Sequence, residues 1–236
     1  MKNYPVVLTN MNRLTTCKNM VEKLFELNGS SDITIIDNAS TYEPLLKWYD
    51  EVKNDIKIIR HEGNHGPWVF FTSNLWSTID SDFYVYSDAD LELNQEMPYN
   101  WQEIMLEYYN KNNGDLKIAL SLRLDDIPDH YEFKDRVKAH QNVCWYPTEE
   151  ENVYRAISDL QFCFDSKTKG HRYDSLRLAG KFMARHVPWY LDFNNIDEEE
   201  KYYIEHINPG FDQAMYSFLH HGALKSKAWR IYNWCL

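Results

Sequence analysis

The chain has 236 residues, of which 44% are hydrophobic, so it is long enough to bury the core of one domain but little more. Its 25 Lys and Arg residues are outnumbered by 36 Asp and Glu residues, and a net charge of −11 without a long basic run disfavours nucleic acid and anionic membrane surfaces as partners. Aromatic residues make up 15% of the chain, more than such a core needs, which is a first indication of a carbohydrate or nucleotide ligand.

The first half of the chain alternates short apolar runs with helical patterns. We predict strands at residues 4–9, 33–37, 56–59, 83–86 and 118–122, and helices at 15–27, 67–78 and 101–109. The capping-box spacing of Ser40 and Glu43 predicts a further helix that ends near Val52. Because strands that alternate with helices form βαβ units, we predict an α/β fold with a mostly parallel central sheet and helices on both faces.

The second half of the chain is less regular. After about residue 123 we predict short strands near 160–164 and 176–178, and helices at 198–207 and 211–221. The run Glu198 to Glu200 is interpreted as a solvated helix start, favoured by the helix dipole. No repeat or flexible linker divides the chain. We therefore predict one domain, residues 1–236, with a nucleotide-binding half at 1–95 and an acceptor half with the C-terminal helices at 96–236.

Polar residues follow the predicted strands, at the carboxyl ends where such sheets bind ligands. Asp88 and Asp90 follow the fourth strand, and an extended segment would place both carboxylates on one side about 7 Å apart, at about 3.3 Å per residue. Such a pair suits a divalent cation that keeps positions open for diphosphate oxygens. A D-x-D sequence alone is most often a solvated loop, so its place directly after a strand carries the functional interpretation.

Asp37, at the end of the second strand, has two interpretations. Its carboxylate can accept from a nucleobase or a ribose hydroxyl, or it can be a turn or helix-capping residue, and both remain open. The chain contains neither G-x-G-x-x-G after the first strand nor a P-loop. A bound nucleotide would therefore be held by strand-end side chains and a metal.

The order of these motifs resembles the GT-A fold glycosyltransferases, specifically the family-2-like inverting enzymes. Residues 4–93 carry the resemblance, through Val-Leu-Thr-Asn-Met-Asn-Arg, Ile-Ile-Asp-Asn-Ala-Ser, Glu-Gly-Asn-His-Gly-Pro and Tyr-Ser-Asp-Ala-Asp-Leu. Residues 184–190, Ala-Arg-His-Val-Pro-Trp-Tyr, are similar to the closing motif of small bacterial and viral members. The resemblance implies a metal-dependent, hexosyltransferase-like enzyme that moves a sugar from a nucleotide-diphosphate sugar, usually UDP-linked, to a glycan or other hydroxyl acceptor.

The resemblance also implies three groups of site residues. The donor would be bound by Thr9, Asn10, Asn12, Arg13, Asp37, Asn38, Asn64, Gly66, Asp88 and Ala89. A divalent cation, Mn²⁺ or Mg²⁺, would be held by Asp88, Asp90 and His186. Trp189 and Tyr190 would form an acceptor platform, with packing against the sheet as an equal alternative.

Inversion needs a carboxylate that takes the proton of the acceptor hydroxyl, and it must lie after the D-x-D sequence. The candidates are Asp125, Asp126, Asp159, Asp165 and Asp192. We favour Asp159, with Asp126 second, because the segment 157–164 resembles the family segment in which an Asp precedes a short apolar strand. The usual Thr-Thr after that Asp is Leu160-Gln161 here.

Two other classes of function remain open: a non-catalytic sugar-nucleotide or glycan binding protein on the same scaffold, and a nucleotidyltransferase. The second is disfavoured because residues 9–16 contain no glycine and so form no Gly-rich loop. Cys17, Cys144, Cys163 and Cys235 are scattered, which predicts reduced thiols. With no apparent signal peptide or membrane span, we expect a cytoplasmic protein.

Overall fold

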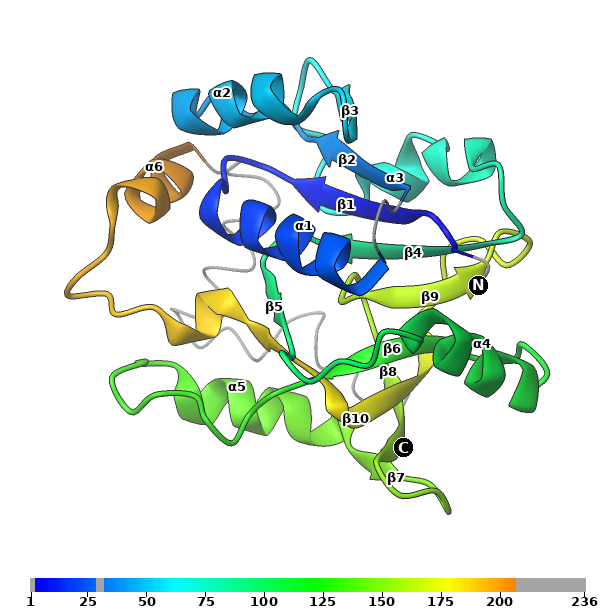
Figure 1. Ribbon diagram of the computed structural model, residues 1–236. Coiled ribbons are helices and arrows are strands. Elements are labelled where there is room, and N and C mark those ends of the chain that lie inside the picture. Colours follow the sequence, from blue (N-terminus) through cyan, green and yellow to red (C-terminus); the bar gives the residue numbers. More distant parts are fainter. Residues whose placement is uncertain (1–2, 29–31, 207–236) are drawn as a thin grey trace.

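Figure 1 shows the computed structural model, which describes residues 3–28 and 32–206. Its strands are β1 (Val6–Asn10), β2 (Ile33–Asp37), β3 (Lys57–Arg60), β4 (Phe83–Asp88), β5 (Leu91–Leu93), β6 (Lys117–Leu122), β7 (Tyr146–Pro147), β8 (Val153–Ile157), β9 (Cys163–Ser166) and β10 (Asp174–His186). They form one ten-stranded sheet in the order β3-β2-β1-β4-β9-β6-β10-β8-β7, and β5 pairs with β10. The helix predicted at 211–221 and Cys235 lie outside the described residues.

The helices of the described segments cover both faces of this sheet. They are α1 (Thr15–Asn28), α2 (Glu43–Val52), α3 (Val69–Thr72), α4 (Trp101–Lys111), α5 (Lys134–Gln141) and α6 (Glu198–His206), with 3₁₀ turns at Leu75–Thr78, Asn142–Cys144 and Val187–Tyr190. In Figure 1, α1 and α4 lie on the face of the sheet that is turned to the viewer. None of the described helices is long and apolar enough to cross a membrane.

The sheet is mixed, and its N-terminal part is parallel as predicted. Strands β3, β2, β1 and β4 are parallel neighbours, and so are β6 and β10. Strand β9 lies between β4 and β6 and runs antiparallel to both. The carboxyl ends of β1, β2 and β4 therefore meet at one edge of the sheet, where open α/β sheets bind ligands.

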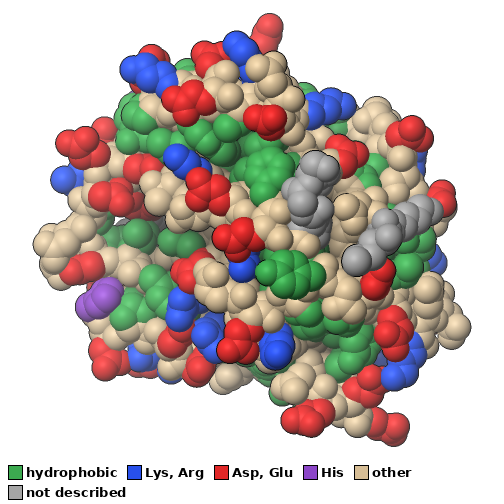
Figure 2. Space-filling model, viewed as in Figure 1, with side chains coloured by type: hydrophobic (Ala, Val, Ile, Leu, Met, Phe, Trp, Pro, Cys, Tyr) green, Lys and Arg blue, Asp and Glu red, His purple; other side chains and the backbone are tan. Residues whose placement is uncertain are grey.

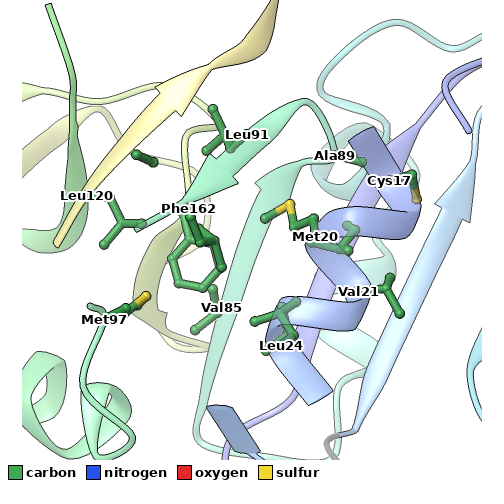
Figure 3. Packing of buried hydrophobic residues seen from close by; sticks show 14 of the residues in the cluster. Cys17, Met20, Val21, Leu24, Val85, Ala89, Leu91, Met97, Leu120 and Phe162 are labelled. Carbon is green, nitrogen blue, oxygen red and sulfur yellow. The ribbon is translucent and has the colours of Figure 1, made fainter. Parts of the chain in front are cut away.

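Buried side chains lie on both faces of the central strands because helices cover both. In β1, Leu8 belongs to the larger core with α1, whereas Val7 belongs to the smaller core with α3. Figure 3 shows the larger core, in which Met20 and Leu24 of α1 lie near Val85 of β4. Burying a side chain of the size of Leu stabilises a fold by about 1.5–3 kcal/mol, so this layer fixes α1 beside the strand ends.

The helix between β2 and β3 forms, but its predicted capping box does not. Helix α2 begins at Glu43 without a side-chain cap. The Ser40 hydroxyl instead accepts from the backbone N–H of Asn12 at 2.8 Å. The Asn12 side-chain oxygen accepts from the N–H groups of Thr41 and Tyr42 at 2.7 and 3.0 Å. The capping prediction is wrong because Asn12, in the loop after β1, bonds the Ser40 hydroxyl and the N–H groups of Thr41 and Tyr42.

The segment predicted as one helix at 67–78 contains α3 and a separate 3₁₀ turn. Between them Asn74 has a φ of 60°, a left-handed conformation that ends helices. The hydroxyl and the N–H of Ser73 both donate to the carbonyl of Val69, a local bonding pattern that Ser favours at helix ends. The prediction of a continuous helix is therefore wrong.

The strand predicted at 176–178 is much longer in the structure. A bulge follows Leu178, with Gly180 at a φ of 61°, and shifts the register of β10 against β6. Glycine takes this conformation without the steric cost of a side chain. Beyond the bulge β10 pairs with β5, and His186 lies opposite Leu91. The bulge thus brings His186 next to the D-x-D segment.

Charged side chains are scattered over the visible surface (Figure 2). Figure 2 shows acidic side chains spread over the visible face, with basic side chains among them. The large exposed hydrophobic side chains of the described residues are tyrosines: Tyr99 is 75% exposed, Tyr146 72% and Tyr173 46%.

Candidate functional site

The ends of β1 and β4 are joined through their backbones at the ligand-binding edge of the sheet. Thr9 pairs with Asp88, and the N–H of Ala89 donates to the carbonyl of Thr9 at 3.0 Å. The N–H of Asp88 donates to the carbonyl of Leu160 at 2.9 Å. Ala89 is buried and Thr9 half-buried. The structure therefore brings together Thr9, Asp88 and Ala89, which were predicted to bind the sugar donor. It also places the backbone of Leu160 beside them.

Asp37 lies beneath this edge and is fully buried. Its carboxylate accepts from Arg60 Nε at 3.0 Å and from the hydroxyl of Tyr49 at 3.3 Å. The Tyr49 hydroxyl in turn accepts from the side-chain amide of Asn10 at 3.0 Å. Asp37 and Asn10 thus belong to a buried polar network that holds the ends of β1 and β2, and their contact with a nucleobase stays a prediction.

The loop after β3 is fastened to the end of β2. The amide nitrogen of Asn38 donates to Asn64 Oδ1 at 2.8 Å and to the carbonyl of Gly66 at 3.0 Å. The Asn38 side-chain oxygen accepts from the N–H of His65 at 2.9 Å. Gly66 has a φ of 80°, where a side chain would be strained. The predicted donor residues Asn38, Asn64 and Gly66 are therefore brought together, with their polar groups bonded to one another.

Arg13 follows β1 and makes a buried ion pair that the sequence did not suggest. Its guanidinium donates to both carboxylate oxygens of Glu200 in α6, at 2.6 and 3.1 Å. It also lies over the ring of Tyr203, 3.9 Å from the ring centre. Burial acts to lower the pKa of Arg13, but the Glu200 charge outweighs it and the pKa is raised, so the pair stays ionised. Arg13 also interacts electrostatically with Asp90.

Helix α6 covers the strand edge, as Figure 1 shows at the carboxyl end of β1. Glu199 accepts from the N–H and the hydroxyl of Thr15, at 3.0 and 2.8 Å, and so caps the start of α1. Glu200 is only 4% exposed, whereas Glu198 is exposed. The prediction of a solvated helix start is correct for Glu198 and wrong for Glu200, because Arg13, 187 residues away in sequence, provides a buried partner.

The D-x-D segment is not one extended run. Strand β4 ends at Asp88 and the chain bends at Ala89 before β5 begins. The expected extended conformation of this segment is therefore wrong, and the placement of its two carboxylates on one side stays a prediction. No group of three His, Cys, Asp or Glu side chains within residues 3–28 and 32–206 has the arrangement of a metal site.

Asp90 and His186 form a pair beside this bend. His186 Nε2 lies 3.5 Å from Asp90 Oδ2, and the N–H of Val187 donates to the carbonyl of Asp90 at 2.9 Å. Asp90 Oδ1 and His186 Nδ1 are buried and have no hydrogen-bond partner among the described residues. Burial, helped by the charge of Arg13, lowers the pKa of His186, so its imidazole is neutral at pH 7. The pair thus offers two unused electron-pair donors of the kinds that divalent metals bind.

Asp126 lies in a pocket of about 260 Å³ next to this pair, lined by Glu92, Asp126, Arg185, Val187 and Tyr190. Its carboxylate accepts from Arg185 Nε at 2.7 Å and from the hydroxyl of Tyr190 at 2.5 Å. Burial acts to raise the pKa of Asp126, but these hydrogen bonds outweigh it and the pKa lies below its ordinary value. Asp126 is therefore an ionised, firmly paired carboxylate.

The two aromatic residues predicted as an acceptor platform have different surroundings. Trp189 is only 7% exposed and belongs to the core, with its ring 4.8 Å from that of His186. Tyr190 lines the Asp126 pocket. The packing alternative therefore describes Trp189, whereas Tyr190 is placed where a ligand can reach it.

Asp159 lies on the other face of the sheet, beside α3. Its carboxylate accepts from the indole N–H of Trp68 at 3.0 Å. Its backbone carbonyl accepts from the buried amine of Lys117, which also donates to the hydroxyl of Tyr86. Burial raises the pKa of Asp159 above its ordinary value, although the Trp68 hydrogen bond and the Lys117 charge act against this. Asp159 is the carboxylate whose environment favours accepting a proton.

The remaining acidic candidates differ from these two. Asp165 is fully buried and paired with Arg172, which marks it as structural. Asp125 and Asp192 lie in loops, the first near Arg123 at 3.3 Å and the second bonded to Asn195 at 2.6 Å.

Comparisons with known proteins relate the fold to that of solved structures. No protein-family model and no curated protein matches the chain. Among solved structures it is similar to GalNAc-T7 with UDP, GalNAc and Mn²⁺, at a TM-score of 0.51 and 13% identity over 78% of this chain and 43% of that one. Weaker similarities, both at 13% identity, are to glucosyl-3-phosphoglycerate synthase from Mycobacterium tuberculosis (TM-score 0.43, 71% of this chain, 57% of that one) and to TarS 1-349 from S. aureus (0.40, 55% and 39%).

The α/β fold with its mixed, mostly parallel central sheet matches GT-A glycosyltransferase structures, and the predicted fold class is confirmed. An identity of 13% shows the fold alone. The chain spans about two fifths of the length of GalNAc-T7 and less than two thirds of the other two structures.

Proposed function

We propose that this protein is a family-2-like, inverting glycosyltransferase that moves a sugar from a nucleotide-diphosphate sugar, most simply UDP-linked, to a hydroxyl of a glycan or other acceptor. The GT-A-like sheet and the gathering of Thr9, Asp88 and Ala89 at its ligand-binding edge support a nucleotide site there. The observation that carries the proposal is the Asp90–His186 pair, with one unpartnered buried atom on each side chain.

This pair fits a divalent cation, because a carboxylate oxygen and an imidazole nitrogen both bind such ions. Asp90 and His186 would hold it, and the imidazole favours Mn²⁺ over Mg²⁺. When bound, the ion supplies positive charge where the leaving diphosphate becomes negative. Arg13 interacts electrostatically with Asp90 at the same edge, where its ion pair with Glu200 offsets its charge.

The proton of the acceptor hydroxyl goes to a carboxylate in this proposal, and we assign Asp159 this role. A general base works best when its pKa lies near the working pH, and burial raises the pKa of Asp159 while pairing lowers that of Asp126. Asp126 instead orients Arg185 and Tyr190 beside the metal pair.

The test is turnover of UDP-sugars by the full chain with Mn²⁺ and after chelation. We expect donor hydrolysis only with metal, and a loss of about 10²–10³-fold in Asp90→Ala, the effect of removing one electrostatic contact to developing charge. Asp50→Ala is the matched control, since its side chain is 77% exposed, and should keep full turnover. Equal turnover in Asp90→Ala and wild type would refute the metal site, and hydrolysis of no nucleotide sugar would refute the enzyme.

A second candidate is a non-catalytic binding protein for sugar nucleotides or glycans. It is favoured by the engagement of Arg13 with Glu200, which leaves this cation paired, and by the lack of a three-ligand metal arrangement in the described residues. Binding of UDP-sugar with Mn²⁺ but without hydrolysis or transfer would select this candidate.

We also propose that the protein acts in the cytoplasm. The three cysteines of the described part, Cys17, Cys144 and Cys163, are buried and free, which suits a reducing compartment. Fractionation of cells that express the full chain, followed by immunodetection, tests this proposal.

A further inference from the structure

A second pocket lies on the α3 face of the sheet, away from the Asp126 pocket. It is a shallow hollow of about 350 Å³ that is widely open to solvent, so it suits one face of a single small ring better than a whole nucleotide. Its lining residues are Trp68, Phe71, Thr72, His171 and Tyr173. Four of the five carry rings, from two segments that lie 99 or more residues apart in sequence.

The rings form a connected wall. The ring of His171 lies 4.6 Å from that of Phe71 and 4.7 Å from that of Tyr173. Tyr173 is 46% exposed, so its ring is accessible to a ligand. Such a wall offers flat apolar faces to a ligand, and the Tyr173 ring also has a polar edge.

The pocket carries no cation that would select an anionic ligand. None of its lining residues is Lys or Arg. Burial lowers the pKa of His171, so its imidazole is neutral at pH 7. The amine of Lys117 is nearby but fully buried, and donates to Tyr86 and to the Asp159 carbonyl. A phosphate or a free diphosphate therefore has little to bind here.

One carboxylate adjoins the ring wall, although it is not among the residues that line the pocket. Asp159 accepts from the indole of Trp68 at 3.0 Å, and its charge acts on both His171 and Tyr173. The side chain is half-buried, so part of it reaches solvent. Aromatic faces beside a single carboxylate acceptor are the groups that an uncharged sugar needs, because its C–H faces pack on rings and its hydroxyls donate to the carboxylate.

Two backbone connections link residues at or next to the pocket to residues of the predicted donor site. Trp68 follows two residues after Gly66, whose carbonyl accepts from Asn38 at the end of β2. Leu160, next to Asp159, accepts from the N–H of Asp88. The residues around the pocket are therefore tied through the backbone to the loop after β3 and to the D-x-D segment.

We propose that the pocket of Trp68, Phe71, His171 and Tyr173 binds one uncharged sugar ring of the acceptor glycan, with a hydroxyl of that ring at Asp159. The proposal rests on the proposed function and deepens it, since it makes the acceptor a saccharide rather than another hydroxyl compound. Tyr173 then determines acceptor affinity and takes no part in binding the donor nucleotide.

The test is saturation-transfer NMR of the full chain with the methyl glycosides of glucose, galactose, N-acetylglucosamine and N-acetylgalactosamine at millimolar concentration. We expect contact with at least one of them, and an affinity about fivefold or more lower in Tyr173→Ala, a typical effect of losing one ring contact. Tyr99→Ala is the matched control, because Tyr99 is 75% exposed and does not line the pocket. Phe71→Ala, with thermal unfolding to confirm folding, should weaken binding in the same way.

Each outcome decides between the proposals. If no glycoside binds, or if Tyr173→Ala binds as well as Tyr99→Ala, the saccharide pocket is wrong. Displacement of the glycoside by tetramethylammonium would also overturn it, because aromatic rings with a carboxylate can instead form a cation cage. Binding of UDP with Mn²⁺, measured on the same samples, should be unchanged in Tyr173→Ala. Glycoside binding without UDP binding would support the pocket and refute the UDP-sugar transferase. UDP binding without glycoside binding would support the transferase and refute the pocket.

Discussion

Asp159 and Asp126 are both candidate bases, and they occupy opposite electrostatic environments. Asp159 has one neutral hydrogen-bond donor, the indole of Trp68, and burial raises its pKa. Asp126 is held by Arg185 and Tyr190, which lower its pKa despite burial. Carboxylates whose environments push their pKa values apart take different roles, one exchanging protons and the other staying charged. The comparison is consistent with the proposed roles, in which the first exchanges a proton and the second orients its neighbours.

The same difference gives the two residues opposite effects on stability. The pKa of Asp126 is lower in the folded state than in the unfolded state. Asp126 therefore stabilises the fold at a pH above its unfolded-state pKa, and this stabilisation is lost as the pH falls through its folded-state pKa. Asp159 has a raised folded-state pKa, so the folded state is favoured most at acidic pH and loses stability as pH rises through that value. At neutral pH the fold gains from Asp126 and bears a cost at Asp159.

The largest expected effect is on turnover. Asp159→Asn should lower kcat for sugar transfer about 10²–10⁴-fold, the usual contribution of a general base, because the amide cannot take the acceptor proton. Asp126→Asn should lower it less than about tenfold, since that residue only orients its neighbours. The measurement is steady-state transfer with saturating donor, acceptor and Mn²⁺. A large loss in Asp126→Asn together with near-normal transfer by Asp159→Asn would reverse the assignment.

Glu200 extends the comparison to a carboxylate in a buried ion pair. Its ion pair with Arg13 has side chains only 9% and 5% exposed, so Glu200→Ala leaves a buried cation without its partner and should cost about 3–5 kcal/mol of unfolding free energy. Denaturant unfolding measures the loss, and Glu198→Ala, an exposed neighbour on α6, should stay within about 0.5 kcal/mol of wild type. The double variant Arg13→Met/Glu200→Leu should recover most of the stability. Equal losses for Glu200→Ala and Glu198→Ala would show that pairing does not hold this helix.

The residues at the carboxyl ends of the strands could be predicted from the sequence, whereas the side-chain pairings around Arg13 and Asp159 could not. The period of apolar residues determines strands, and parallel topology then brings Thr9 and Asp88 together without reference to any side-chain contact. The Arg13–Glu200 pair and the Trp68–Asp159 bond join residues 187 and 91 positions apart, and no local pattern marks them. The bulge near Gly180, which places His186, depends in the same way on tertiary packing.

Replacing the two candidate bases should change the unfolding free energy at pH 7 in opposite directions. Asp126→Asn should lower the unfolding free energy by about 1 kcal/mol, because it weakens charged hydrogen bonds at a partly exposed site. Asp159→Asn should be as stable as wild type or more stable, since it removes a desolvated charge and keeps an acceptor for Trp68. Urea unfolding measures both. Toward acidic pH, where Asp159 is protonated in wild type, the difference between wild type and Asp159→Asn should vanish, and a difference independent of pH would contradict the linkage.

The smallest effect tests the Trp68 hydrogen bond, which with the charges of Lys117 and His171 limits the rise in the pKa of Asp159. The Trp68 indole stabilises the ionised carboxylate, so Trp68→Phe should raise the pKa of Asp159 and move the acidic limb of the kcat profile to higher pH. On the alkaline side of the limb, where Asp159 is ionised in both proteins, kcat should be nearly the same. Trp76→Phe is the control, because Trp76 lies in the 3₁₀ turn after α3 and makes no hydrogen bond to Asp159 in the described structure. A limb that stays in place in Trp68→Phe would contradict this assignment, because the lost hydrogen bond stabilises the ionised form of Asp159.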